Sequence, residues 1–195
     1  MRIFLAGASG LIGVRLVPLL VADGHAVAGM TRSSDRSEAL AELGAEPVVC
    51  DVYDADALTA AMIAFGPELV MHQLTDLPDD YAELERVGGA ANARIRREGT
   101  ANLIDAGRAA GASRLLAQSV AWDLEGEAGA AKAQLERDVL AAGGVVLRYG
   151  QFYGPGTYHP DPERVPKPPR VHIDEAARRT IELLTAEPGI VTITG

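Results

Sequence analysis

The sequence predicts an α/β fold built on a doubly wound parallel sheet. Short apolar segments alternate with segments of helical periodicity along the whole chain of 195 residues, and the first apolar segment leads directly into a glycine-rich turn. Continuous apolar strands separated by helices are typical of a parallel sheet that helices cover on both faces. We therefore expect a single domain over residues 1–195.

The expected elements follow one another in alternation. Seven short apolar runs predict strands at residues 2–6, 26–30, 47–50, 69–72, 115–118, 145–148 and 190–193. Between them apolar residues recur every three or four positions, which predicts helices at residues 14–21, 36–43, 57–65, 90–110, 130–141 and 175–184. Gly44, Gly66 and Gly111 each follow one of these helices and predict where it ends.

The turn after the first strand carries glycines at positions 7, 10 and 13. In such a turn the first glycine permits the tight bend, the second lets a pyrophosphate approach the backbone, and the third lets helix and strand pack closely. The following helix N-terminus offers free N–H groups and a partial positive charge to an anion. We expect a dinucleotide cradle rather than an ordinary strand-to-helix turn, made of Gly7, Ser9, Gly10, Leu11, Ile12 and Gly13.

Arg32 follows the second strand by two residues, at the place where this kind of fold contacts the adenosine ribose. An acidic residue there accepts from the 2′-hydroxyl of NAD, whereas an arginine tolerates the 2′-phosphate of NADP. Arg32, aided by the Ser33 hydroxyl, therefore favours NADP, with NAD as the alternative cofactor and a solvated loop arginine as the alternative role. Asp51, after the third strand, is either an acceptor for the adenine amino group or a turn aspartate.

Composition excludes several classes of protein. A net charge of −9 argues against a nucleic-acid surface, and no apolar run has the length of a membrane span. The N-terminus reads as a strand rather than a signal peptide, and the single cysteine, Cys50, excludes an internal disulfide. His159 and His172 lack metal-ligand spacing to a carboxylate or thiol partner. We expect a cytoplasmic protein that binds no metal, no nucleic acid and no membrane.

Several further motifs follow one another along the chain. They are Gly7-x-x-Gly10-x-x-Gly13, Cys50-Asp51-Val52, Val70-Met71-His72-Gln73-Leu74, Gly99-Thr100-Ala101-Asn102-Leu103, Gln118-Ser119, Leu147-Arg148-Tyr149-Gly150-Gln151-Phe152-Tyr153-Gly154-Pro155-Gly156 and Val171-His172-Ile173-Asp174-Glu175-Ala176. In these the chain resembles the extended short-chain dehydrogenase/reductases, in particular the NAD-dependent epimerase/dehydratase group. The resemblance implies a Rossmann fold, an oxidoreductase or epimerase activity, and cofactor contacts by Val52, Gln73 and Leu74.

The same resemblance implies a catalytic serine after the fifth strand and a Tyr-x-x-x-Lys motif on the next helix. Ser119 takes the serine place and Lys132 the lysine place, where they are expected to contact substrate and cofactor. The tyrosine place falls on Ala128, whose methyl group neither donates nor accepts a proton. Arg96 stands where the family has a helix asparagine.

Three other side chains have two interpretations each. His72, at the end of the fourth strand, either faces the cofactor or is a core histidine. Tyr149 and Tyr153 follow the sixth strand, where either supplies a displaced phenol or simply packs.

The resemblance also predicts what surrounds the cofactor domain. The family's C-terminal substrate lobe is expected to be largely missing, with the proline-rich segment 159–170 as a stiff connector in its place. Family members often pair through the helices expected at 90–110 and 130–141, which predicts a homodimer. Three functions remain open: an atypical NADP(H)-dependent oxidoreductase or epimerase of a small molecule, a non-catalytic dinucleotide sensor or assembly partner, and a repurposed fold that performs a non-redox step.

Overall fold

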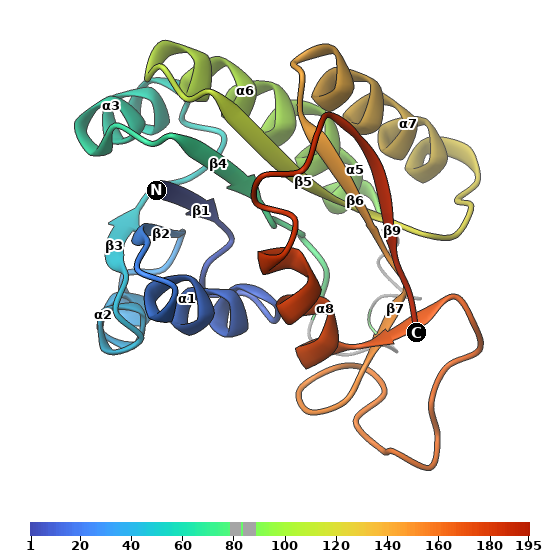
Figure 1. Cartoon of the computed structure of the whole chain (residues 1–195). Coiled ribbons are helices and arrows are strands. Elements are labelled where there is room, and N and C mark those ends of the chain that lie inside the picture. Colours follow the sequence, from blue (N-terminus) through green and yellow to red (C-terminus); the bar gives the residue numbers. More distant parts are fainter. Residues whose placement is uncertain (79–82, 84–88) are drawn as a thin grey trace.

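A computed structural model describes residues 1–78, 83 and 89–195 and has a seven-stranded sheet at its centre (Figure 1). The strand order is β3-β2-β1-β4-β5-β6-β9, and every neighbouring pair is parallel. The strands are β1 (Arg2–Ala6), β2 (Ala26–Thr31), β3 (Glu46–Val49), β4 (Leu69–His72), β5 (Arg114–Val120), β6 (Val145–Tyr149) and β9 (Gly189–Ile193). The predicted doubly wound sheet is confirmed, and the order reverses between β1 and β4, where ligands bind in such sheets.

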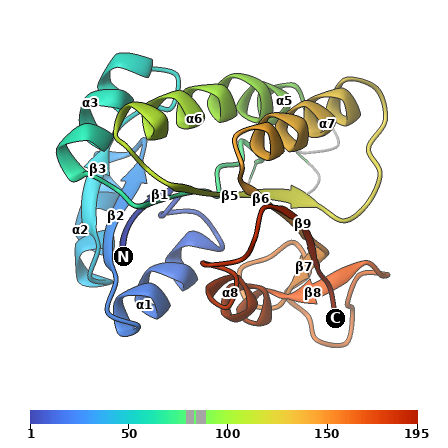
Figure 2. The same cartoon turned by 45° about the horizontal axis from the view of Figure 1, so that its top comes forward.

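Helices cover both faces of the sheet (Figure 2). One layer contains α3 (Ala55–Phe65), α5 (Ala90–Arg94), α6 (Thr100–Ala109) and α7 (Gly126–Ala141), and the other contains α1 (Gly13–Ala22), α2 (Ser37–Glu42) and α8 (Ile173–Ile181). A short 3₁₀ turn (Ser34–Arg36) precedes α2. Apolar clusters pack between each layer and the sheet, so the strands β1, β2, β4 and β6 are buried, as their apolar sequences require, whereas the edge strands β3 and β9 are only partly buried.

The helix expected at 90–110 contains a π-helical turn, η2 (Ile95–Gly99), between α5 and α6. Insertions of this kind often mark functional positions, because they displace one side chain relative to the regular helix. Arg96 lies on this turn.

Two short strands were not expected. β7 (Gln151–Tyr153) and β8 (Arg170–His172) pair in parallel beside the main sheet, and the segment expected as a connector runs between them. Three-residue strands carry too little periodicity to be detected from sequence. No helix of the described part of the chain is long and apolar enough to cross a membrane.

Candidate functional site

The glycine turn has the geometry of a phosphate cradle. Gly7 has φ +91°, and a Cβ on it would lie 2.7 Å from the carbonyl oxygen of Gln73. A Cβ on Gly13 would lie 2.2 Å from the oxygen of Gly7, so helix α1 approaches β1 as closely as the sequence predicts. A Cβ on Gly10 would meet only the oxygen of Gly7, at 3.2 Å, and therefore projects into open space.

The N-terminus of α1 is left open for an anion. Its N-cap, Ile12, supplies no side-chain hydrogen bond. The turn is closed by the Gly10 N–H, which donates to the Gly7 oxygen at 3.0 Å, while the N–H groups of Leu11, Ile12 and Gly13 take part in none of the backbone hydrogen bonds between described loop residues. A row of free N–H groups at a helix N-terminus suits a pyrophosphate.

Two arginines flank this cradle at the end of β2. Arg32 follows Thr31, is half-exposed, and lies 3.2 Å from a carboxylate oxygen of Asp76. Arg36, which was not among the predicted contacts, donates to the carbonyl oxygen of Ser9 at 2.8 Å and so touches the glycine turn itself. Because Arg36 lies on the 3₁₀ turn, its position depends on local geometry that sequence spacing does not reveal.

Hydroxyl groups connect the same corner. The Ser9 hydroxyl donates to Thr31 Oγ1 at 2.9 Å, and the backbone N–H of Ser33 donates to that oxygen at 3.2 Å. An open cavity of about 220 Å³ lies beside Ser9 and Arg36, between α1 and α2. The structure thus brings Ser9, Arg32 and Ser33 together at the carboxyl end of β2.

The remaining predicted cofactor contacts, Asp51, Val52, Gln73 and Leu74, differ in their surroundings. Asp51 accepts from the Tyr53 N–H at 3.0 Å, which is the bond of a turn aspartate. Val52 is 1% exposed and packs in the core, so the structure gives no support for a side-chain contact to the cofactor. The carbonyl of Gln73 lies against Gly7, and Leu74 is half-buried beside it.

His72 is a core histidine in this structure. Its Nδ1 accepts from the Leu74 N–H at 3.2 Å, and its Nε2 lies 3.0 Å from Thr100 Oγ1. Burial, together with the positive charge of Arg96, lowers the pKa of His72 to about 4, so the ring is neutral at pH 7. With Nδ1 accepting, the proton belongs on Nε2, and both ring nitrogens are satisfied.

Tyr149 also packs in the core. Its ring is 2% exposed, its hydroxyl lies 2.7 Å from Thr180 Oγ1, and burial raises its pKa to about 12. Such a phenol keeps its proton at pH 7 and is poorly suited to acid/base chemistry. Tyr153 is half-exposed and stacks edge-on against His172.

Ser119 lies inside β5 rather than after it, because the strand continues to Val120. Its hydroxyl donates to Glu136 Oε1 at 2.6 Å, and the Arg148 guanidinium binds both oxygens of Glu136 at 2.9 and 2.6 Å. Burial alone would raise the pKa of Glu136, but the hydrogen bonds from Arg148 and Ser119 hold it below its ordinary value. The hydroxyl expected to hold substrate is therefore committed to an internal carboxylate.

Lys132 is buried on α7, and its Nζ donates to the carbonyl oxygen of Trp122 at 2.8 Å. Helix α7 begins at Gly126, four residues earlier than expected, so Ala128 lies within it. Ala128, Lys132 and Glu136 are spaced by four and share one face of the helix. Lys132 and Ala128, which takes the place of the family's tyrosine, thus lie on one face of α7.

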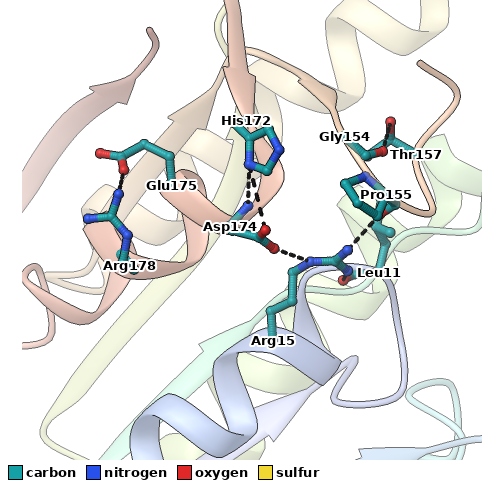
Figure 3. Close-up of polar contacts among 9 residues, drawn as sticks. All are labelled: Leu11, Arg15, Gly154, Pro155, Thr157, His172, Asp174, Glu175 and Arg178. Atoms are coloured by element: carbon teal, nitrogen blue, oxygen red, sulfur yellow. Dashed lines mark hydrogen bonds and ion pairs between the residues drawn. The ribbon is translucent and has the colours of Figure 1, made fainter. Parts of the chain in front are cut away.

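Hydrogen bonds of Arg15 connect the segments around the small β7–β8 sheet to the glycine turn (Figure 3). The Arg15 guanidinium donates to the carbonyl oxygens of Leu11 and Pro155 at 2.7 and 2.6 Å and to Asp174 at 2.7 Å. These bonds join the glycine turn, the loop after β7 and the start of α8. A single guanidinium therefore holds the loop after β7 and the start of α8 against the glycine turn.

Comparisons with known proteins agree with this geometry. Residues 7–143 match the family model described as NAD(P)H-binding. A Streptomyces 3-diazoavenalumate denitrifying reductase is 41% identical over 184 residues, which cover 80% of this chain and 58% of the relative. A UDP-glucose 4-epimerase of Mycolicibacterium smegmatis is 36% identical over 121 residues, which cover 60% of this chain and 37% of that enzyme.

Among solved structures, the NAD complex of the Thermus thermophilus UDP-glucose 4-epimerase superposes with a TM-score of 0.78 at 21% identity. The match covers 100% of this chain and 78% of that one. At that identity the likeness establishes the fold alone. The chain spans little more than half the length of its Streptomyces relative. Since the family model spans well over half of the chain, this protein belongs to the family described as NAD(P)H-binding.

Proposed function

We propose that the chain is an NADP(H)-dependent reductase of a small electrophile, cytoplasmic and homodimeric. The observation that carries the choice of cofactor is the pair Arg32 and Arg36 beside the glycine turn, with no carboxylate in the position directly after β2. Guanidinium groups bind a phosphate in bidentate fashion, which supports the 2′-phosphate over a free 2′-hydroxyl. When bound, the dinucleotide supplies a hydride.

The substrate side supports an acceptor that needs no proton from the protein. Ala128 occupies the tyrosine place, Tyr149 is buried, and Ser119 and Lys132 are bonded to Glu136 and Trp122. A carbonyl accepts a hydride well only when a donor stabilises the developing oxyanion. A cationic acceptor gains no negative charge on reduction and needs no such donor.

A diazo group in its protonated diazonium form is an acceptor of this kind. Hydride addition followed by loss of N₂ replaces the C–N bond by a C–H bond, and the hydride electron pair remains in that new bond. The Streptomyces relative is named as a denitrifying reductase of a diazo compound. We extend that reaction class, not its particular substrate, to this chain.

The test uses NADPH deuterated at C4 and an ortho-hydroxyarenediazonium compound. We expect enzyme-dependent loss of absorbance at the reduced nicotinamide band, release of N₂, and deuterium at the carbon that carried nitrogen. An enzyme-free blank removes the direct reaction. Tight NADPH binding without turnover of this compound, or of a panel of aldehydes and ketones, would instead support a non-catalytic sensor.

Replacing Arg32 with alanine should weaken NADP(H) binding specifically. Loss of a charge-assisted bond to the 2′-phosphate costs about 1.5–3 kcal/mol, or roughly tenfold or more in Kd, and NAD(H) binding should barely change. Asp76→Asn is the matched variant, because it removes the carboxylate that pairs with Arg32 and should strengthen NADP(H) binding severalfold. Equal affinity of the parent for the two cofactors, measured by titration, would refute the role of Arg32.

We expect the homodimer to form through α6 and α7. Helix α7 exposes Ala130, Ala133 and the apolar Leu140, which suits close helix packing. Leu140→Glu should convert the dimer to a monomer in sedimentation experiments at tens of micromolar. Ile190→Glu, on the equally exposed Ile190 of the edge strand β9, should not. A strictly monomeric parent would contradict the proposal.

A further inference from the structure

We infer that Arg96 forms a subsite for a carboxylate group of the substrate, at the carboxyl ends of β4 and β5 between η2 and α7. The inference rests on the proposed function, because it names the substrate class for the same site. It arises from a cation that the fold desolvates without pairing it to any described residue.

Arg96 differs from the arginines on either side of it. Arg94 is bonded to Glu98 at 2.7 and 3.0 Å, and Arg97 is bonded to Glu127 at 2.6 Å. Within residues 1–78, 83 and 89–195, no hydrogen bond or ion pair reaches the Arg96 guanidinium, although the residue is partly buried. Burial lowers the pKa of Arg96, and the nearby charge of Glu136 only partly offsets this effect.

A partly desolvated cation without a partner is costly, and the carboxylate of Glu136 does not compensate it. Both oxygens of Glu136 are already taken by Arg148, and one also accepts from Ser119. Lys132 adds a further positive charge on the same face of α7. Three cations, Arg96, Lys132 and Arg148, therefore lie near one buried carboxylate, that of Glu136. Among the described residues, the exposed Asp123 is the only other carboxylate that acts on Arg148.

The surroundings of Arg96 place this charge at the substrate end of the fold. His72, which senses the charge of Arg96, ends β4, and Ser119, bonded to Glu136, lies near the end of β5. Arg97 is bonded to Glu127, the residue next to Ala128, so η2 lies beside the first turns of α7. Ligands enter parallel sheets at the carboxyl ends of the strands.

The chemistry of the group favours a carboxylate. A guanidinium presents paired N–H donors that match the two oxygens of a carboxylate, and desolvation strengthens that bond. The cofactor's pyrophosphate has its own cradle at the glycine turn, on the other side of β4. The methyl group of Ala128 leaves room for a substrate where a phenol would stand, and Arg96 gives that substrate a fixed anchor.

The test measures binding without turnover. Trp122, the only tryptophan, lies beside the site because its carbonyl oxygen accepts from Lys132, so its fluorescence reports occupancy. In saturating NADP⁺ we expect benzoate to bind at least about tenfold more tightly than benzamide, its neutral counterpart. Arg96→Gln should remove that preference and leave benzamide unchanged. Arg96→Lys keeps the positive charge but loses the paired N–H donors of the guanidinium, so it should retain part of the preference for benzoate.

Arg97→Gln is the matched control, because Arg97 lies on the same turn but is paired with Glu127. Absence of saturable benzoate binding, equal binding of benzoate and benzamide, or the same loss in Arg97→Gln would overturn the subsite. Weaker NADP⁺ binding by Arg96→Gln, with benzoate binding intact, would assign the guanidinium to the cofactor and overturn it too. Benzoate binding through Arg96 in a protein that never oxidises NADPH would overturn the proposed function alone.

Discussion

Replacing Gly10 with valine should abolish dinucleotide binding and leave the protein folded. Within 4 Å, a Cβ at this position meets only the oxygen of Gly7, at 3.2 Å, so the protein accommodates the side chain with a shift of a few tenths of an ångström. The rest of the valine projects into the space that a pyrophosphate needs at the N-terminus of α1. Binding is measured by NADPH fluorescence and folding by circular dichroism.

Gly13→Ala separates this effect from a structural one. Its Cβ would lie 2.2 Å from the oxygen of Gly7 and 2.5 Å from that of Ala8, and backbone atoms at that distance must move. We expect this variant to lose about 1–3 kcal/mol of stability or more, since overpacked sites are strained. Unchanged NADPH binding by folded Gly10→Val would remove the glycine turn from the site.

The sheet and the cradle were predictable because their signals are local. Each buried strand is a continuous apolar run, and the chemistry of the glycine turn lies within seven consecutive residues. The predicted boundaries were wrong where the structure depends on residues distant in the chain. Strand β5 extends past Gln118 because Ser119 and Val120 continue the pairing with Arg148 and Tyr149 of β6, partners 29 residues away.

Helix α7 shows a second limit of sequence reasoning. The sequence predicted a helix from residue 130, yet the helix begins at Gly126 and includes Gly129. A Cβ on Gly129 would lie 2.1 Å from the oxygen of Leu124, so this glycine serves a close approach rather than a helix end. The pairing of Arg32 with Asp76, and the lack of a partner for Arg96 among the described residues, likewise depend on segments distant in the chain.

Replacing Ala128 with tyrosine should raise NADPH-dependent reduction of small activated carbonyls by about tenfold to a hundredfold, the usual contribution of a positioned general acid. The phenol would stand four residues before Lys132, on the face of α7 that both positions share. The lysine ammonium favours the ionised phenol and so lowers its pKa toward the working range. The measurement is kcat/KM as a function of pH, compared with the parent.

Ala128→Phe is the control, because it adds the same ring without the hydroxyl. It should bring neither the gain nor the new ionisation in the pH profile. Reduction of the diazonium compound should gain nothing from the tyrosine, since that reaction takes no proton from the protein, so the two substrates respond differently to one substitution. If the parent already reduces carbonyls and loses that activity in Ala128→Tyr, the alanine serves to clear space for the substrate, and its interpretation as a lost acid is wrong.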